Sequence, residues 1–165
     1  MTDAHVEKET LTVDVNIPQH ADRVATPLFS KTRQTLIDAG GTCWVCGELN
    51  SKESPLEAHH LHIERCLAEM IDWALFIKDA EAGLLGDAVK NFDWRSFSAA
   101  VPFNPYAFVD DMTVNGQLLC KKHHTGADEG KHTMPEPLWK AQRWAKEGYR
   151  FNSVEIVHHF NATGV

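Results

Sequence analysis

The sequence lacks long hydrophobic runs, and no stretch approaches the roughly 18 uninterrupted apolar residues of a membrane-spanning helix. The first ten residues are polar and acidic, so they do not form the apolar core of a secretory signal peptide. Internal repeats are absent as well. With 43% hydrophobic and 24% charged residues, the composition is that of a globular protein. We therefore expect a cytoplasmic protein without a membrane partner.

Cysteine is scarce, with four residues in a chain of 165. Outside a secretory context, so few cysteines are more typical of free thiols or metal ligands than of disulfides. Cys43, Cys46 and Cys120 fall in short motifs with metal-ligand spacing. Cys66 stands apart, and we interpret it as a small buried hydrophobic residue in a helix.

The chain also lacks an excess of positive charge. Its net charge of −7 argues against a protein that coats DNA generically, because phosphate neutralisation requires clustered Lys and Arg. From Cys120 to Arg150, however, the chain has seven basic and four acidic residues, which gives this segment a local charge of +3. Any contact with nucleic acid is therefore expected from this part of the chain.

Residue patterns predict a disordered tail over 1–10 and a half-buried strand over 11–17, where apolar and polar residues alternate. A helix is expected over 28–39, since Thr26 and Pro27 supply an N-cap and a first-turn proline, and Gly40 follows its end.

Further along, apolar residues at helical spacing predict one helix over 61–78. Glycines, prolines and six aromatic residues over 83–109 indicate a short helix followed by an irregular, aromatic-packed loop. A closing helix is expected over 138–147, after a proline-rich entry. Residues 149–157 are ambiguous between a strand and a short helix, with a preference for the strand.

Two short motifs have the spacing of zinc knuckles. Cys43 and Cys46 are separated by two residues and followed by Gly47, so both sulfurs can reach one ion. Cys120 and His123 repeat that spacing after 73 intervening residues. Together they predict a tetrahedral Cys3His site for structural Zn²⁺. The alternatives are a redox pair, or free thiols with surface histidines.

His59 and His60 lie between these motifs, in the segment Glu57-Ala58-His59-His60-Leu61-His62. Adjacent side chains on an extended segment point to opposite faces. One imidazole can therefore hold a metal ion while its neighbour reaches a water molecule or a substrate.

The order Cys-x-x-Cys, Glu-x-His-His, Asn, Leu-Cys-x-x-His-His resembles that of the HNH nucleases, the ββα-metal superfamily. Asn115 lies five residues before Cys120, where that family places its middle asparagine. The continuation from His124 to His132 is similar to small HNH proteins encoded by bacteriophages. The resemblance covers residues 43–132.

The resemblance implies a role for each matching residue. His60 would be the general base that deprotonates a water molecule, a task suited to an imidazole with an ordinary pKa of about 6.5. His59 and His124 would bind a catalytic divalent ion such as Mg²⁺ or Mn²⁺. Asn115 would either bind that ion through its carbonyl oxygen or orient the loop that carries the base.

Other residues remain open between two interpretations. Lys121, Lys122, Lys131 and His132 are candidates for contacts with phosphate, but a solvated basic face or a turn cap would explain them too. Glu57 is either an exposed strand carboxylate or a residue that orients a histidine.

We therefore predict an α+β fold: a zinc-braced ββα-metal (HNH-like) centre surrounded by helices, forming a single domain over 11–165. The motif halves are 43–60 and 115–132, with a largely helical insertion over 61–114. The predicted function is metal-dependent hydrolysis of DNA phosphodiester bonds. The alternative is a non-catalytic, zinc-stabilised protein of the same fold, such as a phage factor, whose partner is a host or phage protein or a nucleic acid.

Overall fold

The computed structural model describes residues 24–127, 129–133 and 136. These residues divide into two compact units, each described by itself below. The knuckle unit consists of Cys43–Glu57 and the described residues from Leu119 onward. The helical unit consists of residues 24–42 and Ala58–Leu118. The single domain expected over 11–165 stays a prediction.

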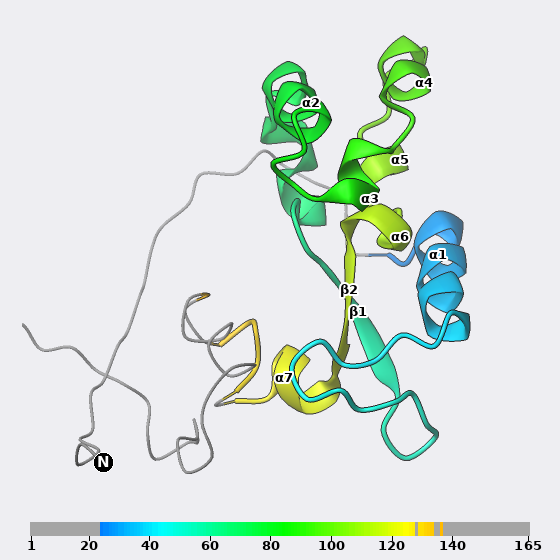
Figure 1. The fold of residues 1–165 in the computed structure, drawn as a ribbon, viewed down its shortest axis with the longest axis vertical. Helices are drawn as coiled ribbons and strands as arrows, with labels where there is room; N and C mark the ends of the chain where they lie inside the picture. Colours follow the sequence, from blue (N-terminus) through cyan, green and yellow to red (C-terminus); the bar gives the residue numbers. More distant parts are fainter. Residues whose placement is uncertain (1–23, 128, 134–135, 137–165) are drawn as a thin grey trace, which may run out of the picture. The chain divides into compact units, whose positions relative to one another are not determined.

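The described residues form an α+β structure with a two-stranded sheet, seven α-helices and one 3₁₀ helix (Figure 1). The strands are β1 (Leu56–His60) and β2 (Gly116–Cys120), and each contributes residues to both units. The α+β class is therefore confirmed, whereas the ββα-metal arrangement remains a proposal. The helices are α1 (Pro27–Asp38), η1 (Arg65–Met70), α2 (Trp73–Glu81), α3 (Asp87–Lys90), α4 (Trp94–Ala99), α5 (Tyr106–Val109), α6 (Met112–Asn115) and α7 (Lys121–Thr125).

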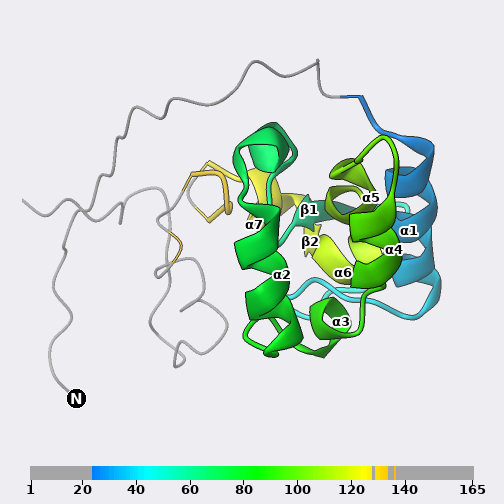
Figure 2. The same cartoon turned by 90° about the horizontal axis from the view of Figure 1, so that it is seen from above.

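Helix α1 matches the helix predicted over 28–39. The Thr26 hydroxyl accepts a hydrogen bond from the N–H of Phe29 at 3.1 Å, and Pro27 occupies the first turn. Gly40 follows the helix with a φ of +78°, a conformation that favours glycine. The helix packs against α6 in the helical unit (Figure 2), where the Thr32 hydroxyl accepts the N–H of Met112 at 2.9 Å.

The single helix predicted over 61–78 is wrong. The chain instead forms the 3₁₀ helix η1, two extended residues and then α2. Asp72 explains the break, because its carboxylate accepts the N–H of Leu75 at 3.0 Å and caps a new helix. The apolar spacing was correct, but it runs through two helices.

The irregular loop predicted over 83–109 is also wrong in part, since the segment contains α3, α4 and α5. Its aromatic packing is confirmed. Phe108 is fully buried, and its ring centroid lies 5.1–5.8 Å from those of four neighbouring aromatic residues. The neighbours are Trp73, Phe76, Phe92 and Trp94. The insertion over 61–114 is thus largely helical, as predicted, and it holds the core of the helical unit.

Several predictions fall outside the described residues: the tail over 1–10, the strand over 11–17, the helix over 138–147 and the segment 149–157. Among the described helices, none combines the length and the apolar character that crossing a membrane requires. The cellular compartment stays a prediction.

Candidate metal centre and histidine pocket

The knuckle unit brings the four predicted zinc ligands together. Cys43 and Cys46 lie before β1, Cys120 ends β2, and His123 lies on α7. One ligand atom from each residue lies within 4.8 Å of all the others. The Cys3His cluster predicted from the two knuckles is therefore present, close enough to hold one metal ion.

The separations fit tetrahedral zinc. At Zn–S and Zn–N distances of about 2.3 and 2.0–2.1 Å, two sulfurs should be about 3.8 Å apart, and a sulfur and a nitrogen about 3.6 Å apart. The Sγ atoms of Cys46 and Cys120 are separated by 3.9 Å. His123 Nδ1 lies 3.6 Å from Sγ of Cys43 and 3.2 Å from Sγ of Cys120. The donor set of three sulfurs and one imidazole is one that zinc prefers.

The three thiols titrate very differently. Burial raises the pKa of Cys43, but hydrogen bonds from His123 and from main-chain N–H groups outweigh it and lower that pKa to about 6. Burial, with the nearby charge of Cys43, raises the pKa of Cys120 to about 12. Burial raises the pKa of Cys46 too. Three thiolates therefore need a cation to compensate their charge, and zinc would supply it.

Helix α7 directs its two histidines to different places. Successive helical residues point about 100° apart, so His123 faces the cysteines while His124 faces away from them. Nε2 of His123 lies 3.8 Å from Oε2 of Glu129, on the side opposite its sulfur contacts. A carboxylate in that place orients a metal-binding imidazole.

His124 makes two contacts within the knuckle unit. Its Nδ1 lies 2.6 Å from Oε2 of Glu57, and its Nε2 lies 3.2 Å from Nε2 of His132. Both interpretations of Glu57 therefore have support, because this strand residue keeps 39% of its side chain exposed and its carboxylate also contacts the ring of His124. His132 lies beside His124, and its predicted role in binding phosphate stays a prediction.

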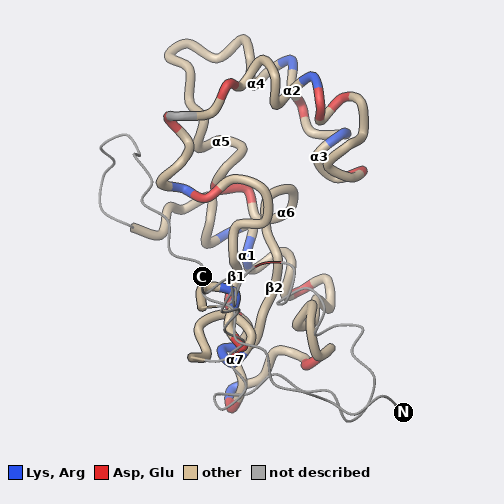
Figure 3. The backbone as a smooth tube through the Cα atoms, turned by 90° about the vertical axis from the view of Figure 1, so that its left-hand side faces the viewer, with Lys and Arg blue, Asp and Glu red and all other residues tan. Residues whose placement is uncertain are grey.

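The three lysines predicted to bind phosphate lie in different surroundings. Lys121 and Lys122 are exposed at the start of α7, and Nζ of Lys122 lies 2.6 Å from Oε2 of Glu129. The main-chain N–H of Lys131 bonds to the carbonyl of His123 at 3.0 Å. In the helical unit, α2 and α3 carry both signs of charge (Figure 3), so these helices form no basic surface. The three lysines stay candidates.

The helical unit contains the histidine pair at the end of β1. Both side chains meet Glu64: Nε2 of His59 lies 3.2 Å from Oε1, and Nδ1 of His60 lies 3.6 Å from Oε2. Nδ1 of His59 also contacts the carbonyl of His60. His59 is buried, whereas His60 borders a cavity and packs against Phe29, with ring centroids 5.8 Å apart.

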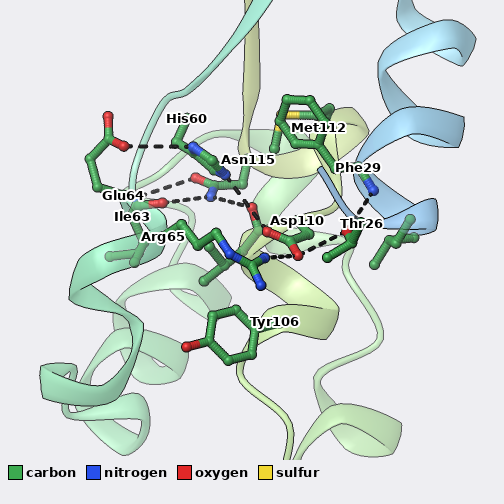
Figure 4. Close-up of polar contacts among 12 residues, drawn as sticks. Thr26, Phe29, His60, Ile63, Glu64, Arg65, Tyr106, Asp110, Met112 and Asn115 are labelled. Atoms are coloured by element: carbon green, nitrogen blue, oxygen red, sulfur yellow. Dashed lines mark hydrogen bonds and ion pairs between the residues drawn. The ribbon is translucent and has the colours of Figure 1, made fainter. Parts of the chain in front are cut away.

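The cavity beside His60 has a volume of about 180 Å³. Its apolar lining comes from α1 and the residues before it, and its polar lining comes from the end of β1, the start of η1 with the residue before it, and the residue after α5. Figure 4 shows the carboxylate of Asp110 between Arg65 and Thr26, with the imidazole of His60 nearby. The cavity is lined by Val24, Ala25, Phe29, His60, Glu64, Arg65 and Asp110.

Asn115 fastens the turn that follows the two histidines. Its Oδ1 accepts the main-chain N–H groups of His62 and Ile63 at 2.9 and 3.1 Å. Its Nδ2 donates to the carbonyls of Ile63 and Val109, both at 2.9 Å. The fully buried amide thus has four hydrogen bonds, its full complement.

The charges around His60 shift two titrations. Burial lowers the pKa of His60, but the carboxylates of Asp110 and Glu64 together outweigh it and raise that pKa above 6.5. Burial raises the pKa of Asp110, but the donors of His60, Arg65 and Thr26 outweigh it and lower that pKa below its ordinary value. The cavity therefore favours a protonated His60 beside an ionised Asp110.

No protein-family model matches the chain, and neither a curated protein nor a solved structure matches it. The resemblance to HNH nucleases thus rests on the sequence motifs alone.

The structure unites the zinc ligands in one unit, and His60 with Asn115 in the other. The assignment of His59 and His124 to one catalytic ion stays a prediction, because His59 belongs to the helical unit and His124 to the knuckle unit. Sequence analysis missed Glu64 and Asp110. Two signals existed: Glu64 lies four residues after His60, and Asp110 follows the apolar residues Phe108 and Val109.

Proposed function

We propose that this protein is a metal-dependent endonuclease that hydrolyses DNA phosphodiester bonds, with His60 as the general base. The main support for this proposal is the hydrogen bonding of Asn115. In the family that the motifs resemble, a middle asparagine serves the histidine pair, and here Asn115 bonds directly to the turn that follows His60. An asparagine with a purely local role would not bridge residues 52 positions apart.

Of the two roles left open for Asn115, the hydrogen bonds favour orientation of the base loop. Oδ1 already accepts two N–H groups, which occupy both lone pairs of the carbonyl oxygen. Metal ligation through that oxygen would require one of those bonds to break. We therefore assign Asn115 to holding the turn, and no metal contact to it.

His60 would take a proton from water through Nδ1. Its other nitrogen, Nε2, is buried and has no hydrogen-bond partner, so the attacking water cannot reach it. Only the neutral imidazole accepts a proton, and the raised pKa of His60 places that form at pH values above about 6.5. Hydrolysis is therefore expected to increase with pH through this range.

Two metal ions belong to the proposal. Zinc bound by the Cys3His cluster would brace the knuckle unit, as expected of a closed site with four protein ligands. A second divalent ion, Mg²⁺ or Mn²⁺, would stabilise negative charge on the phosphate. Its assignment to His59 and His124 comes from the sequence, and the Glu57 contact supports His124, since metal-binding histidines commonly donate their other N–H to a carboxylate.

A second candidate function is that of a non-catalytic, zinc-stabilised binding protein. The carboxylates of Glu64 and Asp110 beside His60 favour it, because they would repel a phosphate that enters the cavity, and among the described residues that line it only Arg65 and a protonated His60 oppose that repulsion. A protein or peptide with a cationic group would suit this surface better than DNA.

Nicking of supercoiled plasmid separates the two functions. The native protein is dialysed, its zinc content is confirmed, and the plasmid is incubated with no added ion, with Mg²⁺ and with Mn²⁺. Cleavage that requires the added ion is the expected result. The exposed-residue variant Lys90→Ala should cleave like the native protein. Absence of cleavage with either ion, on single- and double-stranded DNA, would favour the binding protein.

A further inference from the structure

Two buried polar atoms face each other in the helical unit without hydrogen-bond partners. They are Nε2 of His60 and Oδ1 of Asp110, which lie 3.9 Å apart. Among buried side-chain nitrogens and oxygens of the described residues, these two alone are unsatisfied. Buried polar groups are nearly always paired, so two complementary unsatisfied atoms on opposite sides of one short gap point to a shared role.

The other oxygen of Asp110 is fully engaged. Oδ2 accepts the hydroxyl of Thr26 at 2.9 Å and the guanidinium of Arg65. The Arg65 guanidinium also lies over the ring of Tyr106, 4.4 Å from its centroid. These contacts fix the carboxylate so that Oδ1, the oxygen without a partner, faces the imidazole (Figure 4). An aspartate needed only for its salt bridge with Arg65 would not have to present Oδ1 to the histidine.

The backbone on both sides of the gap is held by the same residue. Nδ2 of Asn115 donates to the carbonyl of Val109, beside Asp110, and to that of Ile63, in the turn after His60. One amide therefore anchors the backbone beside Asp110 and in the turn after His60. A shift of about 1 Å in the imidazole would bring its Nε2 within the range of an N–H···O bond. Catalytic hydrogen bonds are often long before the substrate binds.

We propose that Asp110 is the positioning residue of His60. Its Oδ1 accepts the N–H of Nε2, which holds the neutral imidazole in the Nε2–H tautomer and leaves the lone pair on Nδ1. The carboxylate of Glu64 lies 3.6 Å from Nδ1 and would favour the other tautomer, but it is partly exposed to water, whereas Nε2 and Oδ1 are both buried without another partner. This inference rests on the proposed function in so far as His60 is the base. A carboxylate behind an imidazole fixes both the tautomer and the ring orientation, and its amide replacement favours the wrong tautomer.

The tautomer can be measured without any activity. Two-bond ¹⁵N–¹H correlation spectra of ¹⁵N-labelled native protein, recorded at alkaline pH, distinguish the protonated ring nitrogen from the one with a lone pair. The variant His60→Gln assigns the signals. We expect the Nε2–H tautomer for His60 in the native protein. A neutral His60 with its proton on Nδ1 would overturn the proposal, whether or not any variant folds.

Asp110→Asn tests the consequence, and Asp111→Asn is the matched control. Asp111 caps α6 by accepting the N–H of Thr113 at 3.0 Å, a bond that asparagine also makes. In Asp110→Asn we expect the Nε2–H signal of His60 to weaken and plasmid nicking to fall about 10²-fold or more. Thermal unfolding shows whether each variant is folded.

The outcomes separate the two proposals. If the native protein does not nick DNA, the proposed function fails, and the spectra alone decide the pairing: a tautomer that changes in Asp110→Asn supports it. If a folded Asp110→Asn keeps both the tautomer and the nicking rate of the control, Asp110 does not position His60. If only stability falls, with tautomer and rate unchanged, the pairing with Arg65 is the whole role of Asp110.

Discussion

The side chain of Asn115 is bonded to both main-chain polar groups of Ile63: its Oδ1 accepts the N–H at 3.1 Å, and its Nδ2 donates to the carbonyl at 2.9 Å. The turn after β1 is thereby fixed to the residue that precedes β2. Since His59 and His60 end β1, this bond pair sets the position of the histidines.

Replacement of Asn115 by Ala should destabilise the helical unit by about 2 kcal/mol or more, because it leaves buried N–H and C=O groups of the turn unpaired. Urea unfolding followed by the fluorescence of buried Trp94 measures this loss. The exposed residue Asn91 gives the control, since Asn91→Ala should change the free energy of unfolding little. Equal stability of the two variants would contradict the role of Asn115.

Cys120→Ser should abolish stoichiometric zinc binding, because Cys120 contributes one of three sulfurs in a site with four ligands. Cys66→Ser is the matched control, as Cys66 lies outside the cluster. Elemental analysis of the purified proteins should find about one zinc per chain in the control and none in Cys120→Ser. Retention of zinc by Cys120→Ser would show that the cluster is not the site.

The sequence was sufficient to predict the Cys3His cluster and insufficient to predict the surroundings of His60. Cys43, Cys46, Cys120 and His123 were predictable because ligand spacing within each knuckle is a local property. The role of Asp110 was not predictable, because it depends on contacts with Arg65 and Thr26, which are 45 and 84 residues away in the sequence. Long-range contacts of this kind leave no periodic pattern in the sequence.

The helix boundaries also include one that the sequence predicts and one that it does not. Helix α1 was predictable because Thr26 and Pro27 mark its start locally. The break between η1 and α2 was not, because the apolar stripe continues through it and Asp72 acts as a cap without interrupting the period. A sequence period reports which side chains are buried, and it does not show that they belong to one helix.

Gly116→Ala should destabilise the junction between α6 and β2. A Cβ atom at this position would lie 2.2 Å from the carbonyl oxygen of Met112 and 2.7 Å from its Cα, so the backbone would have to move. We expect a loss of about 1–3 kcal/mol, the usual range for overpacking. Thermal unfolding measures it, with Ala substitution of the exposed Ser98 as a control. An unchanged melting temperature would contradict this close approach.

Stability should depend on pH through Asp110. The pKa of Asp110 is lowered in the folded protein, so its stabilising contribution is complete above its unfolded pKa of about 3.9. That contribution should be lost as the pH falls through the lower folded pKa. Melting temperatures of native protein and Asp110→Asn should therefore converge in acid. A constant difference down to about pH 2 would contradict the lowered pKa.

The contribution of His60 to stability should depend on pH in the opposite direction. Its pKa is raised in the folded protein, so its contribution is complete below its ordinary pKa of 6.5 and is lost as the pH rises through the folded value. The stability difference between native protein and His60→Gln should therefore shrink above about pH 7. A difference that grows with pH would show that the folded protein favours the neutral imidazole instead.

The rate of plasmid nicking by His60→Ala relative to native protein decides whether His60 is the general base, with zinc content and folding verified for both proteins. A loss of about 10²-fold or more is expected, because His60 is the base proposed for the attacking water. Equal rates in the two proteins would contradict the assignment of His60 and would point to a nuclease that co-purifies with both.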